Sequence, residues 1–143
     1  MGLDQYGMIR NKQIDFKKVY SDKYEPEKDG FVWRKHARLQ TFMAREFKKQ
    51  NPKEDTDAHS GNIDGLGFNG DEHKVVITKD ILKRLENAIK EKYFNHFATD
   101  GFFWGHQFQE EQAKSYKKQD LEFVKFCKDA LEKKEVIEYS CSW

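Results

Sequence analysis

Hydrophobic residues recur at helical spacing in three stretches of the chain, with charged residues on the other faces. The first stretch runs roughly from Trp33 to Gln50, and the second follows Thr78, a residue type that caps helices. The third begins at Asp120 as its cap, or earlier, near Gln109. The inward-facing positions are His36, Leu39, Met43 and Phe47; Ile81, Leu82, Leu85, Ala88, Ile89 and Tyr93; and Leu121, Val124, Cys127 and Leu131. This spacing predicts three amphipathic helices.

Four shorter segments have the composition or the alternation of β-strands. They are residues 1–10, 73–78, 101–105 and 137–143. The last alternates most cleanly, with Ile137, Tyr139, Cys141 and Trp143 on one face. These strands are too short and too polar on one side for a parallel sheet that is covered on both faces. We therefore predict one α+β domain over residues 1–143, a small, mainly antiparallel sheet of about four strands with three helices packed on one face.

Two irregular loops interrupt this pattern, near residues 11–29 and 51–72. The second contains Pro52 and four of the nine glycines of the chain. Residues 29–33 and 100–104 share the pattern D-G-F-x-W, each ahead of a predicted helix. An internal duplication and ordinary turn chemistry would both produce this match, and the sequence leaves the two open.

Composition narrows the class of protein. Aromatic residues make up 15% of the 143 residues, which lets a chain with 36% charged residues still fill a core. The formal net charge of +1 supplies no overall attraction to nucleic acid, so the sequence disfavours that partner. The longest apolar runs are three residues, too short to cross a bilayer, and the amino terminus lacks the apolar stretch of a signal peptide. We expect a cytoplasmic protein with no membrane contact.

The most distinctive polar cluster is Trp33, Arg34, Lys35 and His36, because it combines permanent charge, an imidazole and an aromatic ring at a predicted helix start. Such a cluster could hold a phosphate or a base. Successive helical residues point about 100° apart, however, so not all four side chains can converge on one ligand, and a solvated helix flank with His36 packed at the edge of the core is favoured. Trp104, in a run of three aromatic residues, could stack on a base, although core packing explains that run better. We take these five residues as candidates for ligand binding.

Other motifs lack the context that their chemistry needs. Residues 65–70 spell GxGxxG, but a polar loop precedes them and acidic residues follow, so nucleotide binding is not predicted. Residues 55–73 gather Asp and His side chains without the register of an EF-hand, and a solvated loop is preferred to a cation site. Cys127 and Cys141 lie on apolar stripes, which favours core packing over reactivity. We therefore predict no catalytic residue, no metal site and no cofactor.

Five short motifs follow one another from end to end of the chain: MGLDQY at the start, WRKH at 33–36, GFFWG at 101–105, the QDLEF entry to the last helix, and the terminal YSCSW. In this order they resemble a family of small tailed-phage proteins of the cyanophage type. The departures are Trp104, where the family has Phe, and Cys141 in the terminal motif. The resemblance implies a phage-encoded accessory protein of unknown activity, acting in the cytoplasm of the infected bacterial host. It supplies no catalytic residue.

The family often carries the label phosphoglycerate kinase by automatic transfer. Phosphoryl transfer needs a cradle for phosphate and magnesium, and that enzyme closes two large domains, for which this chain is too short. The sequence therefore predicts a different function.

Three hypotheses about function remain. The preferred one is a non-catalytic binding module that engages a host or phage protein or sequesters a small anionic ligand. The second is a small enzyme that acts on a phosphate-bearing metabolite, with Arg34 and Lys35 as anion clamps and His36 as acid or base. The third, nucleic-acid binding, has the least support because the charge is balanced. A homodimer is compatible with all three.

Overall fold

The computed structural model describes residues 3–53, 68, 70, 72–93, 96 and 105–143. Its helices and strands are β1 (Asp4–Ile9), α1 (Phe16–Val19), α2 (Pro26–Asp29), β2 (Phe31–Arg34), α3 (Ala37–Gln50), β3 (Val75–Val76), α4 (Lys79–Lys90), α5 (His106–Glu132) and β4 (Ile137–Ser142). The predicted α+β class is confirmed. Among these helices none is both long and apolar enough to cross a membrane.

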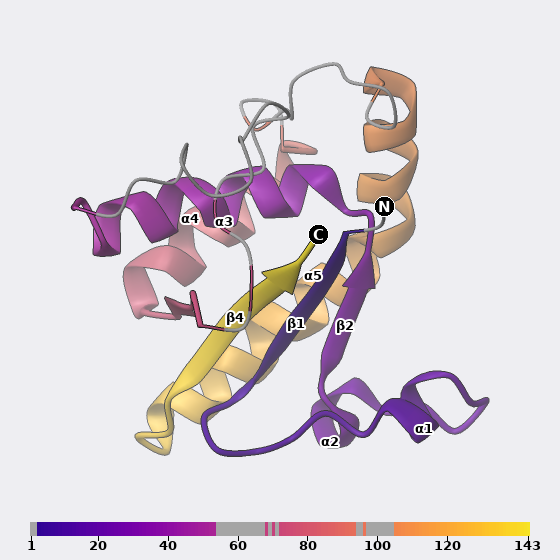
Figure 1. The fold of residues 1–143 in the computed structure, drawn as a ribbon, viewed down its shortest axis with the longest axis vertical. Coiled ribbons are helices and arrows are strands. Elements are labelled where there is room, and N and C mark those ends of the chain that lie inside the picture. The colour runs from indigo at the N-terminus through magenta and orange to yellow at the C-terminus, as the bar shows by residue number, and fades with distance from the viewer. Residues whose placement is uncertain (1–2, 54–67, 69, 71, 94–95, 97–104) are drawn as a thin grey trace.

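The sheet has four antiparallel strands in the order β2-β1-β4-β3. The first and last strands of the chain, β1 and β4, pair along their whole length, from Asp4 opposite Ser142 to Ile9 opposite Ile137. Both chain ends therefore lie at the same end of the sheet (Figure 1). This central pairing joins residues that are far apart in sequence, so the two terminal segments form one structural unit.

The two faces of the sheet are covered differently. Helices α3, α4 and α5 supply the core on one face, as predicted, and α5 runs behind the strands in Figure 1. Residues 11–30, with the one-turn helices α1 and α2, follow the opposite face, where the Phe16 ring lies edge-on to Tyr6 at 5.9 Å. The predicted loop 11–29 is thus held by aromatic contacts.

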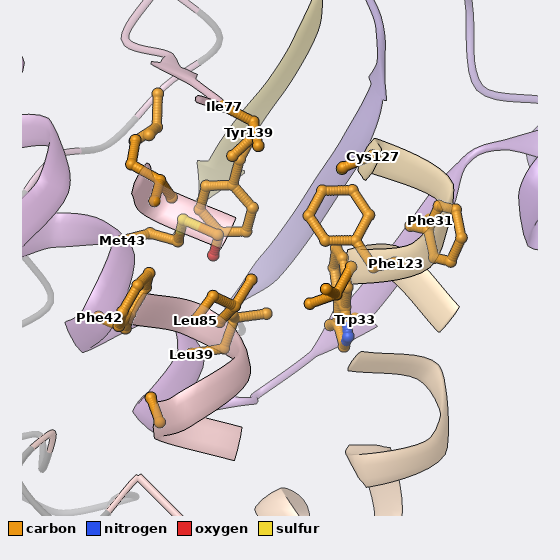
Figure 2. Packing of buried hydrophobic residues seen from close by; sticks show 14 of the residues in the cluster. Phe31, Trp33, Leu39, Phe42, Met43, Ile77, Leu85, Phe123, Cys127 and Tyr139 are labelled. Carbon is orange, nitrogen blue, oxygen red and sulfur yellow. The ribbon is translucent and has the colours of Figure 1, made fainter. Parts of the chain in front are cut away.

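Aromatic side chains fill the centre of the core, between the sheet and α5 (Figure 2). The Trp33 ring meets Phe123 edge-on at 5.1 Å and lies 6.2 Å from Tyr139. Phe31 packs on Phe123 at the same centroid distance of 5.1 Å. Each such ring removes a large apolar area from water, which explains how a chain with many charged residues builds a core.

The first long helix begins at Ala37, so the prediction of a helix from Trp33 is wrong at its start. The segment Phe31–Arg34 is strand β2 instead, because its alternate side chains pack on the sheet's helical face. Lys35, at φ 59°, turns the chain between the two elements. The sequence did not reveal this strand, because a buried Trp33 fits two patterns equally well. It fits the helical spacing that continues at His36, and it fits the alternation of a β-strand.

The last helix is a single element from His106, and Asp120 lies inside it rather than at its cap. Thr78, by contrast, caps α4 as predicted, with its hydroxyl accepting a hydrogen bond from the Ile81 N–H at 3.2 Å. The predicted strand at 73–78 is reduced to Val75–Val76. Of the strand predicted at 101–105, residues 101–104 lie outside the described residues, and Gly105 is the N-cap of α5. The predicted stripe of α4 is buried throughout.

Side chains close the outer edge of β2. The Val32 N–H donates to the Tyr24 hydroxyl at 3.1 Å, and the Val32 carbonyl accepts from Gln119 Nε2 at 2.8 Å. The Arg34 N–H donates to the Tyr116 hydroxyl at 3.0 Å. An open strand edge recruits further strands, so these bonds oppose pairing of β2 with another chain.

The opposite edge, at β3, is closed by one side chain. The Gln50 amide donates to the Val76 carbonyl at 2.6 Å and accepts from the Val76 N–H at 3.0 Å. The end of α3 thus takes the place of a further strand. A homodimer built by extending the sheet at Val32, Arg34 or Val76 would have to break these hydrogen bonds.

Gly7→Ala tests the packing of β1 on α5. A Cβ at Gly7 would lie 2.6 Å from Phe123 Cε1, and Phe123 is fully buried among other rings. We expect a loss of about 1–3 kcal/mol in the free energy of unfolding, measured by urea denaturation, because an overpacked core must shift. In a Phe123→Leu background the same substitution should cost less. An equal cost in both backgrounds would show that the ring is not the obstacle.

Candidate functional site

A buried carboxylate, Asp120, collects hydrogen bonds from three side chains. Its Oδ1 accepts from Trp33 Nε1 at 2.8 Å. Its Oδ2 accepts from the Tyr93 hydroxyl at 2.8 Å and lies 2.9 Å from His36 Nε2. Asp120 is 1% exposed and His36 is fully buried. We call these four residues the Asp120 cluster.

The cluster joins four separate parts of the fold. Trp33 comes from β2, His36 occupies the N-cap position of α3, Tyr93 follows α4, and Asp120 lies in the middle of α5. A carboxylate is costly to bury unless its oxygens accept hydrogen bonds. The three hydrogen bonds therefore hold β2, the start of α3 and the turn after α4 against the middle of α5.

A second polar network, formed by Gln5, Tyr139 and Gln40, continues from the backbone of His36. The Gln5 side chain accepts from the His36 N–H at 2.9 Å and donates to the His36 carbonyl at 3.0 Å. Gln5 Nε2 also lies 3.0 Å from the Tyr139 hydroxyl, which donates to Gln40 Oε1 at 2.6 Å. This network holds the start of α3 against β1 and β4.

The imidazole of His36 is enclosed by aromatic rings. Tyr116 stacks on it at 5.4 Å with an interplanar angle of 10°, and Tyr93 meets it edge-on at 5.3 Å. Its Nδ1 is buried and has no hydrogen-bond partner among the described residues. An imidazole that is 0% exposed cannot exchange protons with a substrate unless the core opens.

The other reactive groups of the core are held in their neutral forms. Burial, and then the neighbouring Asp120 carboxylate, raises the pKa of Tyr93 well above its usual range. Burial likewise raises the pKa of Tyr139 and of the Cys127 thiol. Both cysteines are buried and form no disulfide, and Cys141 Sγ donates to the Phe68 carbonyl at 3.3 Å. A protonated, buried thiol is a poor nucleophile, so these groups pack rather than react.

Of the four candidate ligand residues at positions 33–36, two are buried and two are exposed. Trp33 and His36 belong to the buried Asp120 cluster. Arg34 and Lys35 are exposed, and Arg34 Nε donates to Asp4 Oδ1 at 3.3 Å. The structure therefore does not bring the four side chains to one ligand. Trp104 lies outside the described residues.

The predicted acidic loop and the glycine motif also fall mainly outside the described residues, at 54–67, 69 and 71. Within the part of the chain that the structure describes, no group of three or more His, Cys, Asp or Glu side chains could hold a metal ion.

Helices α3 and α4 carry a surplus of positive charge. Each has four basic residues, against one acidic residue in α3 and two in α4, whereas the whole chain has a net charge of only +1. A groove of about 570 Å³ lies between the two helices. It is lined by the basic side chains Arg45, Lys48, Lys49 and Arg84 and by the apolar side chains Phe42 and Ala88. We call it the α3–α4 groove.

A buried carboxylate fixes part of this groove. Glu46, 3% exposed, accepts from Arg84 Nε at 3.1 Å and from Arg84 Nη2 at 2.6 Å, and Lys49 Nζ lies 3.4 Å away. Burial alone would raise the pKa of Glu46, but the hydrogen bonds and charge of Arg84 hold it below its ordinary value. The two-point contact fixes the orientation of the Arg84 guanidinium, which a lysine could not match.

His96 borders the same groove, with its ring 5.2 Å from Phe42. Burial, and then the charge of Arg45, lowers the pKa of His96 from 6.5 to about 4. The imidazole is therefore neutral at neutral pH.

Sequence reasoning missed Asp120, Tyr93 and Gln5 as members of a polar network, and it missed the α3–α4 groove. Of these features, the groove alone could have been predicted, from the surplus of basic residues in the sequences of two predicted helices. Comparison of the chain with protein-family models, with curated proteins and with solved structures finds no match.

Asp120→Ala tests the structural role of the cluster. It leaves three buried donors without an acceptor, so we expect the free energy of unfolding to fall by about 3–5 kcal/mol. Asp129→Ala, at an exposed position of the same helix, is the matched control and should change it by less than about 0.5 kcal/mol. Urea denaturation measures both. Similar small effects of the two substitutions would show that Asp120 is not structurally required.

The pKa of His96 predicts a loss of stability in mild acid. Below pH 6.5 the unfolded chain binds a proton at this imidazole that the folded chain takes up only near pH 4. The free energy of unfolding should therefore fall between these two pH values. His96→Gln should reduce that fall, as measured by denaturation at pH 7 and pH 5. An unchanged fall in the variant would assign the pH dependence to other groups.

Proposed function

We propose that the protein is a non-catalytic binding module, and that its α3–α4 groove holds an acidic segment of a host or phage protein. The observation that carries this proposal is the concentration of basic side chains around an apolar floor, at Arg45, Lys48, Lys49 and Arg84. Positive potential steers an acidic partner to the groove. The resemblance to phage proteins supports a role as an accessory protein in the cytoplasm of an infected bacterium.

A protein partner fits this groove better than a nucleic acid. Two carboxylates, Glu46 and Glu91, lie among the basic groups and would repel a continuous phosphate backbone. A protein segment offers separated negative charges that can avoid them. The aromatic member of the floor, Phe42, is 2% exposed and therefore offers no surface on which a base could stack.

The enzyme hypothesis has less support. It requires His36 to work beside Arg34 and Lys35, but His36 is buried against Asp120 while the two cations are exposed. The Asp120 cluster uses its donors and acceptors to hold the fold, and the remaining Nδ1 of His36 is closed off by the rings around it.

Charge reversal in the groove tests the proposal. Arg45→Glu combined with Lys48→Glu should abolish salt-sensitive capture of an acidic protein from extracts of infected cyanobacteria. The matched control, Lys17→Glu with Lys18→Glu, makes the same charge change on the exposed helix α1 and should retain capture. Quantitative pulldown at 50 and 300 mM salt measures this effect. Equal loss in both double variants, or capture that single-stranded DNA displaces, would contradict the proposal.

A further inference from the structure

A second cavity lies on the other side of α4. It has a volume of about 320 Å³ and is bounded by the end of α4, the turn that follows, and the first half of α5. Its polar walls are Lys92, Lys114 and Lys117. Its inner wall is formed by Ile89, Tyr93 and Ala113, all of them buried. We call it the lysine cavity.

The charges of the three lysines are not offset by ion pairs, a feature that they share with Lys79, Lys83, Lys118 and Lys125 among the described residues. No salt bridge is formed by Lys92, Lys114 or Lys117 within the described residues, although each is exposed. Lys49, Lys90 and Lys128 all lie within 4.0 Å of a carboxylate. Three like charges gathered around one cavity repel each other, and a bound anion would relieve that repulsion.

The one acidic residue at the cavity, Glu110, offsets only one of the three lysine charges, and it also interacts electrostatically with the neighbouring Arg38. Arg38 in turn donates from Nη1 to the Lys92 carbonyl at 3.0 Å. This contact fixes the backbone of the turn that carries Lys92.

The inner wall is rigid and apolar. Lys92 and Tyr93 both have φ 56°, a left-handed conformation that side chains rarely adopt, and the Tyr93 hydroxyl is bound to Asp120. The ring of Tyr93 therefore has a fixed position beside Ile89 and Ala113. The alkyl stems of the lysines extend this apolar surface towards the solvent.

We propose that the lysine cavity binds a small organic anion, one that joins a phosphate or carboxylate group to a flat apolar body. The ammonium groups bind the charge, and the alkyl stems of the three lysines, which border the buried wall, pack against the body. The site shares no lining residue with the α3–α4 groove, so it is independent of the function proposed for that groove.

Calorimetric titration with phenyl phosphate tests this proposal, with inorganic phosphate and benzoate as separate arms. Phenyl phosphate should bind most tightly if both the charge and the flat body contribute. Lys114→Met combined with Lys117→Met should raise its dissociation constant about tenfold or more, because two charge-assisted hydrogen bonds are removed. Lys125→Met with Lys133→Met removes the same charge from exposed positions outside the cavity and should stay within about twofold of the unmodified protein.

One further variant separates binding at this site from binding elsewhere on the protein. The Arg45→Glu and Lys48→Glu protein should bind phenyl phosphate unchanged, whether or not the groove proposal holds. Absence of binding by all three probes at millimolar concentration would overturn the proposal. Equal weakening in the two lysine double variants would also overturn it, since it would mean attraction by net charge alone.

Discussion

The structure depends on keeping one side-chain carboxyl group, that of Asp120, fully hydrogen-bonded inside an apolar core. Its oxygens lie 2.8 to 2.9 Å from three side-chain donor groups, which come from β2, the start of α3 and the turn after α4. Burying such a group is unfavourable unless its partners are all in place. The cluster can therefore form only when the helices and the sheet have their final arrangement, which favours one packing of α5 over its alternatives.

This constraint also limits the chemistry available to the protein. The groups that resemble catalytic machinery in composition, His36, Tyr93 and Asp120, bind one another in the core and are closed to a substrate. Accessible basic side chains line the α3–α4 groove and the lysine cavity on the outer helices. Because side chains bind the outward backbone groups of Val32, Arg34 and Val76, we propose that partners contact these helix surfaces rather than the sheet edges.

Elements with a strong local signal could be predicted from the sequence, and those set by distant contacts could not. The stripe of α4 and the alternation of β4 depend on spacing alone, and both match the structure. Strand β2 was concealed because Trp33 suits either periodicity, and only pairing with β1 decides between them. The local sequence predicted Asp120 as a helix cap. Its actual role was not visible there, because its partners Trp33 and His36 lie more than eighty residues earlier in the chain. For the same reason the sequence did not show that Trp33 and His36 share one buried hydrogen-bond partner.

Hydrogen exchange of the Trp33 indole N–H tests the central claim most directly. This proton is bound to Asp120 Oδ1 in a fully buried side chain, so the account predicts that it exchanges only when the whole domain unfolds. Its exchange free energy, followed by NMR, should then equal the free energy of global unfolding and fall with it as urea is added. Exchange through a local opening of much lower free energy, insensitive to urea, would contradict the claim that the Asp120 cluster holds the fold together.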